Sequence, residues 1–239
     1  MVVYMNLIKV ICLVMYNFFF NAFDVNGPFR FSRACALFTV VFSMTFAPLS
    51  SIAETPVLMV LGDSLVAGHG LPQGKTFPDT LGKTLKNNGI DVKMINAGVS
   101  GDTTAGGRAR LDWSLADDPD AVIIVLGGND LLRGLEPSTS YANLDNIIKR
   151  LKANDISVLL AGMRAPRNLG SEYANEFDAI YRKLVENHDI LFYPFFLDGV
   201  ALRTDLNQSD GMHPNQAGVK IITEKILPYV KALLKRKPK

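Results

Sequence analysis

The chain has 239 residues, 20% of them charged, and a formal net charge of +2. This length favours one α/β domain with an appendage and leaves no room for two large domains. The near-neutral charge excludes a polybasic nucleic-acid binder and an acidic disordered chain, so we expect no nucleic-acid partner.

The segment before residue 54 differs in composition from the rest, since it holds nine of the fourteen phenylalanines. Its second half has the parts of a secretory signal peptide. Arg30 and Arg33 form a basic start, an uncharged apolar stretch follows, and Ala53 ends the segment with a small residue where a signal peptidase cuts. We expect residues 29–53 to be a signal peptide that delivers residues 54–239 to the periplasm.

Two explanations stay open for the apolar residues 1–29: a start codon assigned too far upstream, or an uncleaved membrane anchor. Both cysteines, Cys12 and Cys35, lie in the leader (residues 1–53), so residues 54–239 have no disulfide and no thiol nucleophile. Removing the leader takes away three bases and one acid and leaves a neutral body. We expect this body to be a monomer without a stable membrane anchor.

Five short apolar runs, each followed by a loop and a helix-like stretch, recur after the leader. Runs of β-branched and large apolar residues are typical of strands buried on both faces of a parallel sheet, and the helices between them imply right-handed βαβ crossovers. We therefore expect a single three-layer α/β domain. The predicted strands are 57–61, 92–96, 121–126, 157–161 and 190–195. The predicted helices are 76–88, 103–115, 141–153, 172–187 and 215–234.

Ligands bind open α/β sheets at the carboxyl ends of the strands, so the loops after the predicted strands are where chemistry is expected. The first such loop contains Ser64, close to a helix start where backbone N–H groups favour a developing anion. The second contains Gly101, which can present an N–H to a ligand, and Asp102, which we expect to cap the next helix. The third contains Asn129, which offers an amide donor. Each signal alone is also typical of an ordinary turn.

A fourth block near the end of the chain places Asp210 three residues before His213. A carboxylate can hold one imidazole nitrogen in the required tautomer while the other nitrogen accepts a serine proton. The other two histidines lack this pattern. His69 lies in a glycine-rich loop without a nearby carboxylate in the sequence, and His188 ends a predicted helix, where a cation is favourable.

These four blocks, in this order, resemble the SGNH subgroup of the GDSL hydrolases. The resemblance spans residues 55–235 and is strongest to bacterial periplasmic esterases that act as acyl-CoA thioesterase, arylesterase and lysophospholipase. It implies a flavodoxin-like, five-stranded sheet of order 2-1-3-4-5. Gly98 stands where such relatives often have serine, a departure that leaves the four blocks intact.

Carried over by position, the resemblance implies Ser64 as nucleophile, His213 as general base and acid, and Asp210 as the residue that orients His213. It also implies an oxyanion hole made by the backbone N–H groups of Ser64 and Gly101 and the side-chain amide of Asn129. No cofactor or metal is expected, because the sequence after the leader has no cysteine, no histidine pair at i, i+4 and no phosphate-binding loop.

The expected function is hydrolysis of small-molecule carboxylic esters and thioesters through an acyl-enzyme. Two alternatives stay open: a polysaccharide acetylesterase, and a lipid-binding protein that has lost the chemistry, against which the intact blocks argue. Apolar residues in the loops favour medium to long acyl chains over acetyl. The expected substrate-binding residues are Leu131, Leu132, Met163, Pro166 and Phe196.

Overall fold

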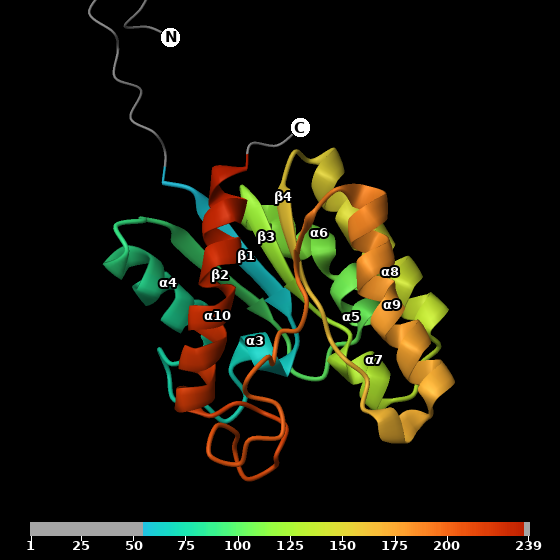
Figure 1. The fold of residues 1–239 in the computed structure, drawn as a ribbon. Helices are drawn as coiled ribbons and strands as arrows, with labels where there is room; N and C mark the ends of the chain where they lie inside the picture. Colours follow the sequence, from blue (N-terminus) through green and yellow to red (C-terminus); the bar gives the residue numbers. More distant parts are fainter. Residues whose placement is uncertain (1–54, 237–239) are drawn as a thin grey trace, which may run out of the picture. The chain divides into compact units, whose positions relative to one another are not determined.

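The computed structural model describes residues 55–236, which form one five-stranded sheet with helices on both faces (Figure 1). The strands pair in parallel in the order β2-β1-β3-β4-β5, so the expected fold and strand order are confirmed. The strands are β1 (Val57–Gly62), β2 (Lys93–Gly98), β3 (Ala121–Val125), β4 (Ser157–Ala161) and β5 (Leu191–Tyr193).

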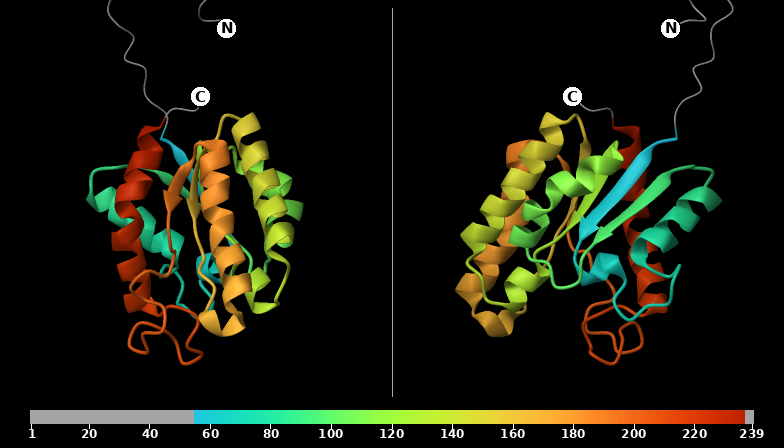
Figure 2. Two further views of the ribbon diagram at one scale, coloured as in Figure 1. Left: turned by 45° about the vertical axis from the view of Figure 1, so that its right-hand side comes forward. Right: turned by 180° about the vertical axis from the view of Figure 1, so that it is seen from behind.

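Two layers of helices cover the sheet. Figure 2 shows α4 and α10 on one face and α5, α8 and α9 on the other. The longer helices are α4 (Phe77–Asn87), α5 (Thr104–Ala109), α8 (Pro137–Ala153), α9 (Ser171–His188) and α10 (Gln216–Lys235). The short ones are α3 (Ser64–Ala67), α6 (Leu111–Ser114) and α7 (Gly128–Leu132), with 3₁₀ turns η1 (Leu115–Asp117) and η2 (Arg167–Leu169).

The central strands are buried on both faces, as their apolar runs predict. Every residue of β3 and of β4 is buried, and so is every residue of β1 after Val57. Burial of such side chains stabilises the domain by roughly 25 cal/mol for each Å² of apolar surface removed from water. The apolar content of the described residues is therefore concentrated in the sheet and in the helix faces that pack on it.

Strand register brings three loops to one edge of the sheet. Gly62 at the end of β1 pairs with Gly98 at the end of β2 and with Val125 at the end of β3. The segments that follow these residues therefore start side by side, although they are far apart in the sequence. This places the first three sequence blocks at a common edge.

Two helices differ from the prediction. The expected helix 103–115 is divided into α5, α6 and η1, and its capping residue is Thr103, whose side chain accepts a hydrogen bond from the N–H of Gly106. The Asp102 cap was therefore wrong, because the Asp102 carboxylate is bound by Arg110 instead. Helix α8 begins four residues earlier than expected, at Pro137, since proline is favoured in a first helical turn where its missing N–H is not needed.

The expected signal peptide and its cleavage point lie outside the described residues. Among residues 55–236, no helix is both long enough and apolar enough to span a membrane.

Candidate active site

A chain of hydrogen bonds connects a serine, a histidine and an aspartate at the carboxyl edge of the sheet. Ser64 is the first residue of α3, directly after β1, and His213 lies in the loop before α10. The His213 Nε2 atom is 2.8 Å from the Ser64 Oγ atom, and the His213 Nδ1 atom is 2.7 Å from the Asp210 Oδ2 atom. The imidazole can therefore take the serine proton on one side while the carboxylate orients it on the other.

Backbone donors hold the Asp210 carboxylate in place. The Oδ1 atom of Asp210 accepts hydrogen bonds from the N–H groups of His213, at 3.0 Å, and Met212, at 2.9 Å. These donors, with the His213 side chain, hold the pKa of Asp210 well below its usual range. Asp210 is therefore ionised at neutral pH, with one oxygen fixed by the backbone and the other directed at the imidazole.

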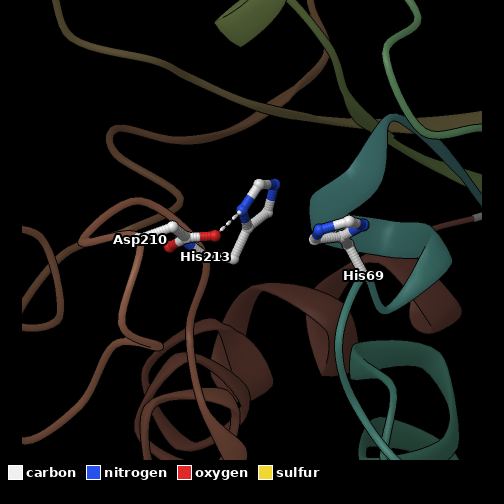
Figure 3. Close-up of side chains that lie close together, drawn as sticks. All are labelled: His69, Asp210 and His213. Carbon is white, nitrogen blue, oxygen red and sulfur yellow. Dashed lines mark hydrogen bonds and ion pairs between the residues drawn. The ribbon is translucent and has the colours of Figure 1, made fainter.

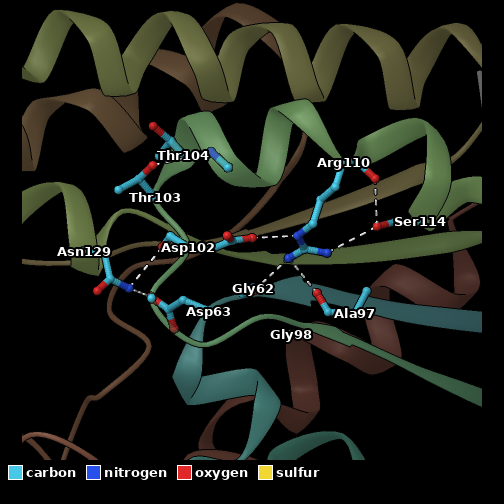
Figure 4. Close-up of polar contacts among 12 residues, drawn as sticks. Gly62, Asp63, Ala97, Gly98, Asp102, Thr103, Thr104, Arg110, Ser114 and Asn129 are labelled. Atoms are coloured by element: carbon cyan, nitrogen blue, oxygen red, sulfur yellow. Dashed lines mark hydrogen bonds and ion pairs between the residues drawn. The ribbon is translucent and has the colours of Figure 1, made fainter.

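Three groups expected to bind an oxyanion line one cavity: Ser64, Gly101 and Asn129. As the first residue of α3, Ser64 has a backbone N–H without an intrahelical acceptor. Gly101 has a φ of 85°, a left-handed conformation that glycine adopts without strain. The Asn129 amide donates to the Asp102 carbonyl at 3.0 Å and to the Asp63 carboxylate at 3.2 Å (Figure 4). The structure thus brings Gly101 and Asn129 to the same cavity as Ser64.

Comparison with known proteins identifies the family. The model of the GDSL-like lipase/acylhydrolase family matches residues 60–221. The chain belongs to the GDSL hydrolases. Members of this family are ester hydrolases, and this chain is an ester-hydrolysing enzyme of the same kind.

Curated relatives of the hydrolase are bacterial esterases. It is 38% identical to Esterase TesA of Pseudomonas aeruginosa over 78% of this chain and 93% of that protein. It is 42% identical to an arylesterase of Vibrio mimicus over 66% of this chain and 79% of that protein. It is 38% identical to thioesterase 1/protease 1/lysophospholipase L1 of Escherichia coli over 69% of this chain and 78% of that protein.

Solved structures agree with this assignment. AlinE4, described as an SGNH-hydrolase family esterase, is 46% identical and superposes with a TM-score of 0.65 over 78% of this chain and all of that one. TesA is 38% identical and superposes with a TM-score of 0.71 over 74% of this chain and 99% of that one.

Asp63 of the hydrolase joins the serine loop to Asn129. Its side chain is only 2% exposed, and it caps α3 by accepting a hydrogen bond from the Leu65 N–H at 3.0 Å. Burial raises the pKa of Asp63 to about 6, although its hydrogen bonds and the nearby His213 act in the opposite direction. This carboxylate is therefore a charged group held in a desolvated position beside the nucleophile.

Arg110 connects the ends of two strands to the loop that follows β2. Its guanidinium donates to the carbonyls of Gly62 and Ala97, each at 2.9 Å, and to the Asp102 carboxylate at 2.6 Å (Figure 4). The Asp102 carbonyl in turn accepts the Asn129 amide. Sequence analysis did not single out Arg110, because its partners lie up to 48 positions away.

Asp130 fixes the other side of the Asn129 loop. It is fully buried and accepts hydrogen bonds from the Thr104 N–H at 2.8 Å and the Ser140 hydroxyl at 3.0 Å. The Asn143 amide extends this network to the Thr104 hydroxyl at 3.0 Å. The network joins α5, α7 and α8, so the segment that presents Asn129 is anchored in the core.

Gly98 occupies a position with no room for a side chain. A Cβ atom there would lie 2.2 Å from the Ala67 nitrogen, which belongs to the main chain of α3. The absence of a serine at this position is thus matched by close packing of β2 against the helix that begins with Ser64.

The cavity beside Ser64 has a volume of about 630 Å³ and is lined by the segments that follow each of the five strands. Four of the five expected substrate-binding residues line it: Leu131, Leu132, Met163 and Pro166. The fifth, Phe196, was wrong. Its ring is 1% exposed and packs edge-to-face on Phe77 at 5.1 Å, whereas Phe195 lines the cavity. β5 ends at Tyr193 and Phe196 lies in the turn that follows, so neighbouring side chains there meet different surroundings.

His69 is a further residue that sequence analysis did not place at the site. Its ring centroid lies 4.6 Å from that of His213, and Gln208 donates to its carbonyl at 2.7 Å. His188, by contrast, lies outside the site and is bonded to Asp145 at 2.7 Å. Only folding shows this difference between the two histidines, because it brings His69 close to His213 and leaves His188 elsewhere.

Proposed function

We propose that the enzyme is a serine esterase that hydrolyses carboxylic esters and thioesters through an acyl-enzyme on Ser64. The observation that carries this proposal is the unbroken series of contacts from the Ser64 hydroxyl through His213 to Asp210, at 2.8 and 2.7 Å. Both separations lie within the range needed for proton transfer between a nucleophile and its base.

In the first half of the reaction, the Ser64 Oγ attacks the acyl carbon while its proton passes to the His213 Nε2. The resulting oxyanion accepts hydrogen bonds from the backbone N–H groups of Ser64 and Gly101 and from the Asn129 amide. Asp210 stabilises the imidazolium that forms. Collapse of the tetrahedral intermediate breaks the bond to the leaving alcohol or thiol, which receives the proton from His213.

In the second half, water attacks the acyl carbon of the acyl-enzyme. His213 takes a proton from this water and then returns it to the Ser64 Oγ as the carboxylic acid leaves. The same groups act in both halves, so the chain's own residues supply every proton transfer in the reaction.

The cavity favours medium to long acyl chains. Its side chains near Ser64 include Leu131, Leu132, Met163 and Leu197. Each methylene that they remove from water stabilises the bound substrate by roughly 0.8 kcal/mol. The names of the relatives, which include arylesterase and thioesterase/lysophospholipase, are consistent with acyl substrates of this kind.

The working form of the enzyme is a periplasmic monomer of residues 54–239. This rests on the signal-like features of residues 29–53 and on the neutral charge of the remainder. Mass spectrometry of the exported protein tests it: a chain that begins at Glu54 is expected, and retention of residues 1–53 would favour the membrane-anchor alternative.

A phosphonate probe tests the nucleophile directly. The Ser64 Oγ is expected to attack the phosphorus of a p-nitrophenyl alkylphosphonate, expel p-nitrophenolate and keep the alkylphosphonyl group. Intact-protein mass spectrometry should show this single addition on the wild type and none on Ser64→Ala. Ser100→Ala is the matched control, because Ser100 lines the same cavity and should leave labelling intact. Labelling of Ser64→Ala at the wild-type rate would refute the assignment.

A further inference from the structure

Two histidines and a carboxylate converge on the outer side of the candidate active site. One ring nitrogen of His69, one of His213 and one carboxylate oxygen of Asp210 all lie within 4.8 Å of one another. Figure 3 shows His69 approaching from the segment after α3, while Asp210 and His213 come from the loop before α10. The proposed reaction at Ser64 uses His213 and Asp210 but has no role for His69.

The two segments are fixed relative to each other by a hydrogen-bonded bridge. Gln208 donates through its Nε2 atom to the His69 carbonyl at 2.7 Å and to the Pro214 carbonyl at 3.0 Å. The Gln208 N–H also donates to the His213 carbonyl at 2.8 Å. His69 is therefore held beside the histidine loop by its main chain and does not meet it by chance contact of two free side chains.

The donor set matches the preferences of zinc. Zn²⁺ binds imidazole nitrogen and carboxylate oxygen at about 2.0–2.2 Å, and three protein ligands with a fourth open position are a common arrangement. Ligand atoms at such distances lie about 3.3 Å apart in a tetrahedral site. The longest separation needs to shrink by roughly 1.5 Å at most, while the 2.7 Å between His213 Nδ1 and Asp210 Oδ2 would have to widen if both atoms bind the metal. The exposed side chains of His69 and Asp210 can supply these changes by rotation. Mg²⁺ and Ca²⁺ prefer all-oxygen sites and fit less well.

We propose that His69, Asp210 and His213 form a zinc-binding site whose occupation switches the enzyme off. The metal needs a ring nitrogen of neutral His213, and either choice disables the base. Zinc on Nε2 occupies the lone pair that accepts the Ser64 proton, whereas zinc on Nδ1 leaves the one proton of the neutral ring on Nε2, which then cannot accept another. The inhibitory consequence rests on the proposed serine mechanism, but binding itself does not.

Binding is tested without any activity measurement, by calorimetric titration of ZnCl₂ into the full chain carrying Ser64→Ala. Adding His69→Gln should weaken zinc binding by about 10-fold or more, since even outer-sphere partners of a metal contribute that much. Adding His213→Gln should have at least the same effect. His188→Gln is the matched control, because His188 also contacts a carboxylate but has no third candidate ligand within residues 55–236. This variant should bind zinc as the parent does. Cys12 and Cys35 are common to all variants and cancel in the comparison.

Inhibition is tested with Ser64 intact, on a p-nitrophenyl ester. Each variant is compared with its own rate in the absence of metal, so that a change in basal activity does not enter. Zinc should inhibit the wild type and His188→Gln reversibly, with recovery in chelator, and the zinc concentration for half-inhibition should rise about 10-fold or more in His69→Gln.

Unchanged zinc affinity or unchanged half-inhibition in His69→Gln would overturn the proposal, as would a wild type that zinc does not inhibit. His69→Asn, at the same exposed position, repeats the test if the glutamine variant folds poorly. Failure of the serine mechanism has a different signature: phosphonate labelling of Ser64 would be absent even without metal.

Discussion

The Asn129 side-chain amide donates a hydrogen bond to the Asp63 carboxylate at 3.2 Å. The same nitrogen donates to the Asp102 carbonyl at 3.0 Å, so both of its protons are engaged. A substrate oxyanion must therefore compete for one of these protons with the Asp102 carbonyl or with the Asp63 carboxylate. Asp63 therefore holds the proposed oxyanion donor in place and also limits how freely that donor can be used.

Asn129→Ala is expected to lower kcat about 10² to 10³-fold with a small change in KM, because an oxyanion donor binds charge that exists only in the transition state. Steady-state kinetics on a p-nitrophenyl ester measure the split. Asn88→Ala, at the exposed asparagine that caps the C-terminus of α4, is the control and should retain wild-type kcat. A wild-type kcat in Asn129→Ala would remove Asn129 from the reaction.

Asp63 is expected to make stability fall as pH rises from 4.5 to 7.5. Its pKa is about 6 in the folded chain and 3.8 in the unfolded reference, so the folded state binds the proton more tightly. Its stabilising contribution is present below pH 3.8 and is lost as pH rises through about 6. Between pH 4.5 and pH 7.5 the free energy of unfolding should fall by about 2 kcal/mol on account of Asp63.

Urea unfolding of wild type and Asp63→Asn at both pH values checks this. The variant loses the hydrogen bond with Asn129, so the pH slope is compared rather than the absolute free energy of unfolding. Asp210 does not interfere, because its lowered pKa places its effect below pH 3.8. If the free energy of unfolding changed equally with pH in the two proteins, the pKa of Asp63 would not be raised by burial.

Arg110→Gln is expected to reduce the free energy of unfolding by about 3 kcal/mol, because it leaves the partly buried Asp102 carboxylate without its cation. The carbonyls of Gly62 and Ala97 lose a donor as well. Arg203→Gln is the matched control: Arg203 also pairs with an aspartate, Asp205, but both side chains are 60% exposed, and little change is expected. Similar losses in the two variants would contradict a special role for Arg110.

Ser64→Ala and His213→Ala are each expected to nearly abolish ester hydrolysis, and the double variant should be hardly worse than either. Ser64 and His213 act in the same proton transfer, so removing the second residue costs little further activity once the first is gone. Measurement of kcat/KM for the three variants decides the matter. If the double variant lost kcat/KM by the product of the two single losses, the residues would act independently and the proposed triad would be refuted.

A series of p-nitrophenyl esters is expected to show kcat/KM rising with acyl-chain length from acetate. Each methylene buried in the cavity should raise kcat/KM about 4-fold, which corresponds to roughly 0.8 kcal/mol, and the cavity beside Ser64 is lined by several leucines. Trp113, the one tryptophan of the chain, is 79% exposed on α6 and does not line this cavity, so it offers no aromatic platform for a sugar beside Ser64. The highest kcat/KM on acetate would instead favour the acetylesterase alternative.

Much of the fold follows from local sequence pattern. The apolar runs predict the five strands because burial on both faces of a sheet leaves few polar positions, and the strand ends then locate the loops that contain Ser64, Gly101 and Asn129. Asp210 and His213 are also visible, because three positions separate them and their contact is local.

The sequence by itself thus determined the sheet, and by way of the family resemblance it predicted the strand order and the residues of the proposed triad. Only the tertiary structure decided which side chains surround them. Arg110 meets Gly62 across 48 positions and Gln208 meets the His69 carbonyl across 139, so no local pattern marks either contact. The exchange of Phe196 for Phe195 has the same origin: a side chain's environment depends on which elements pack against it, and periodicity alone does not specify them.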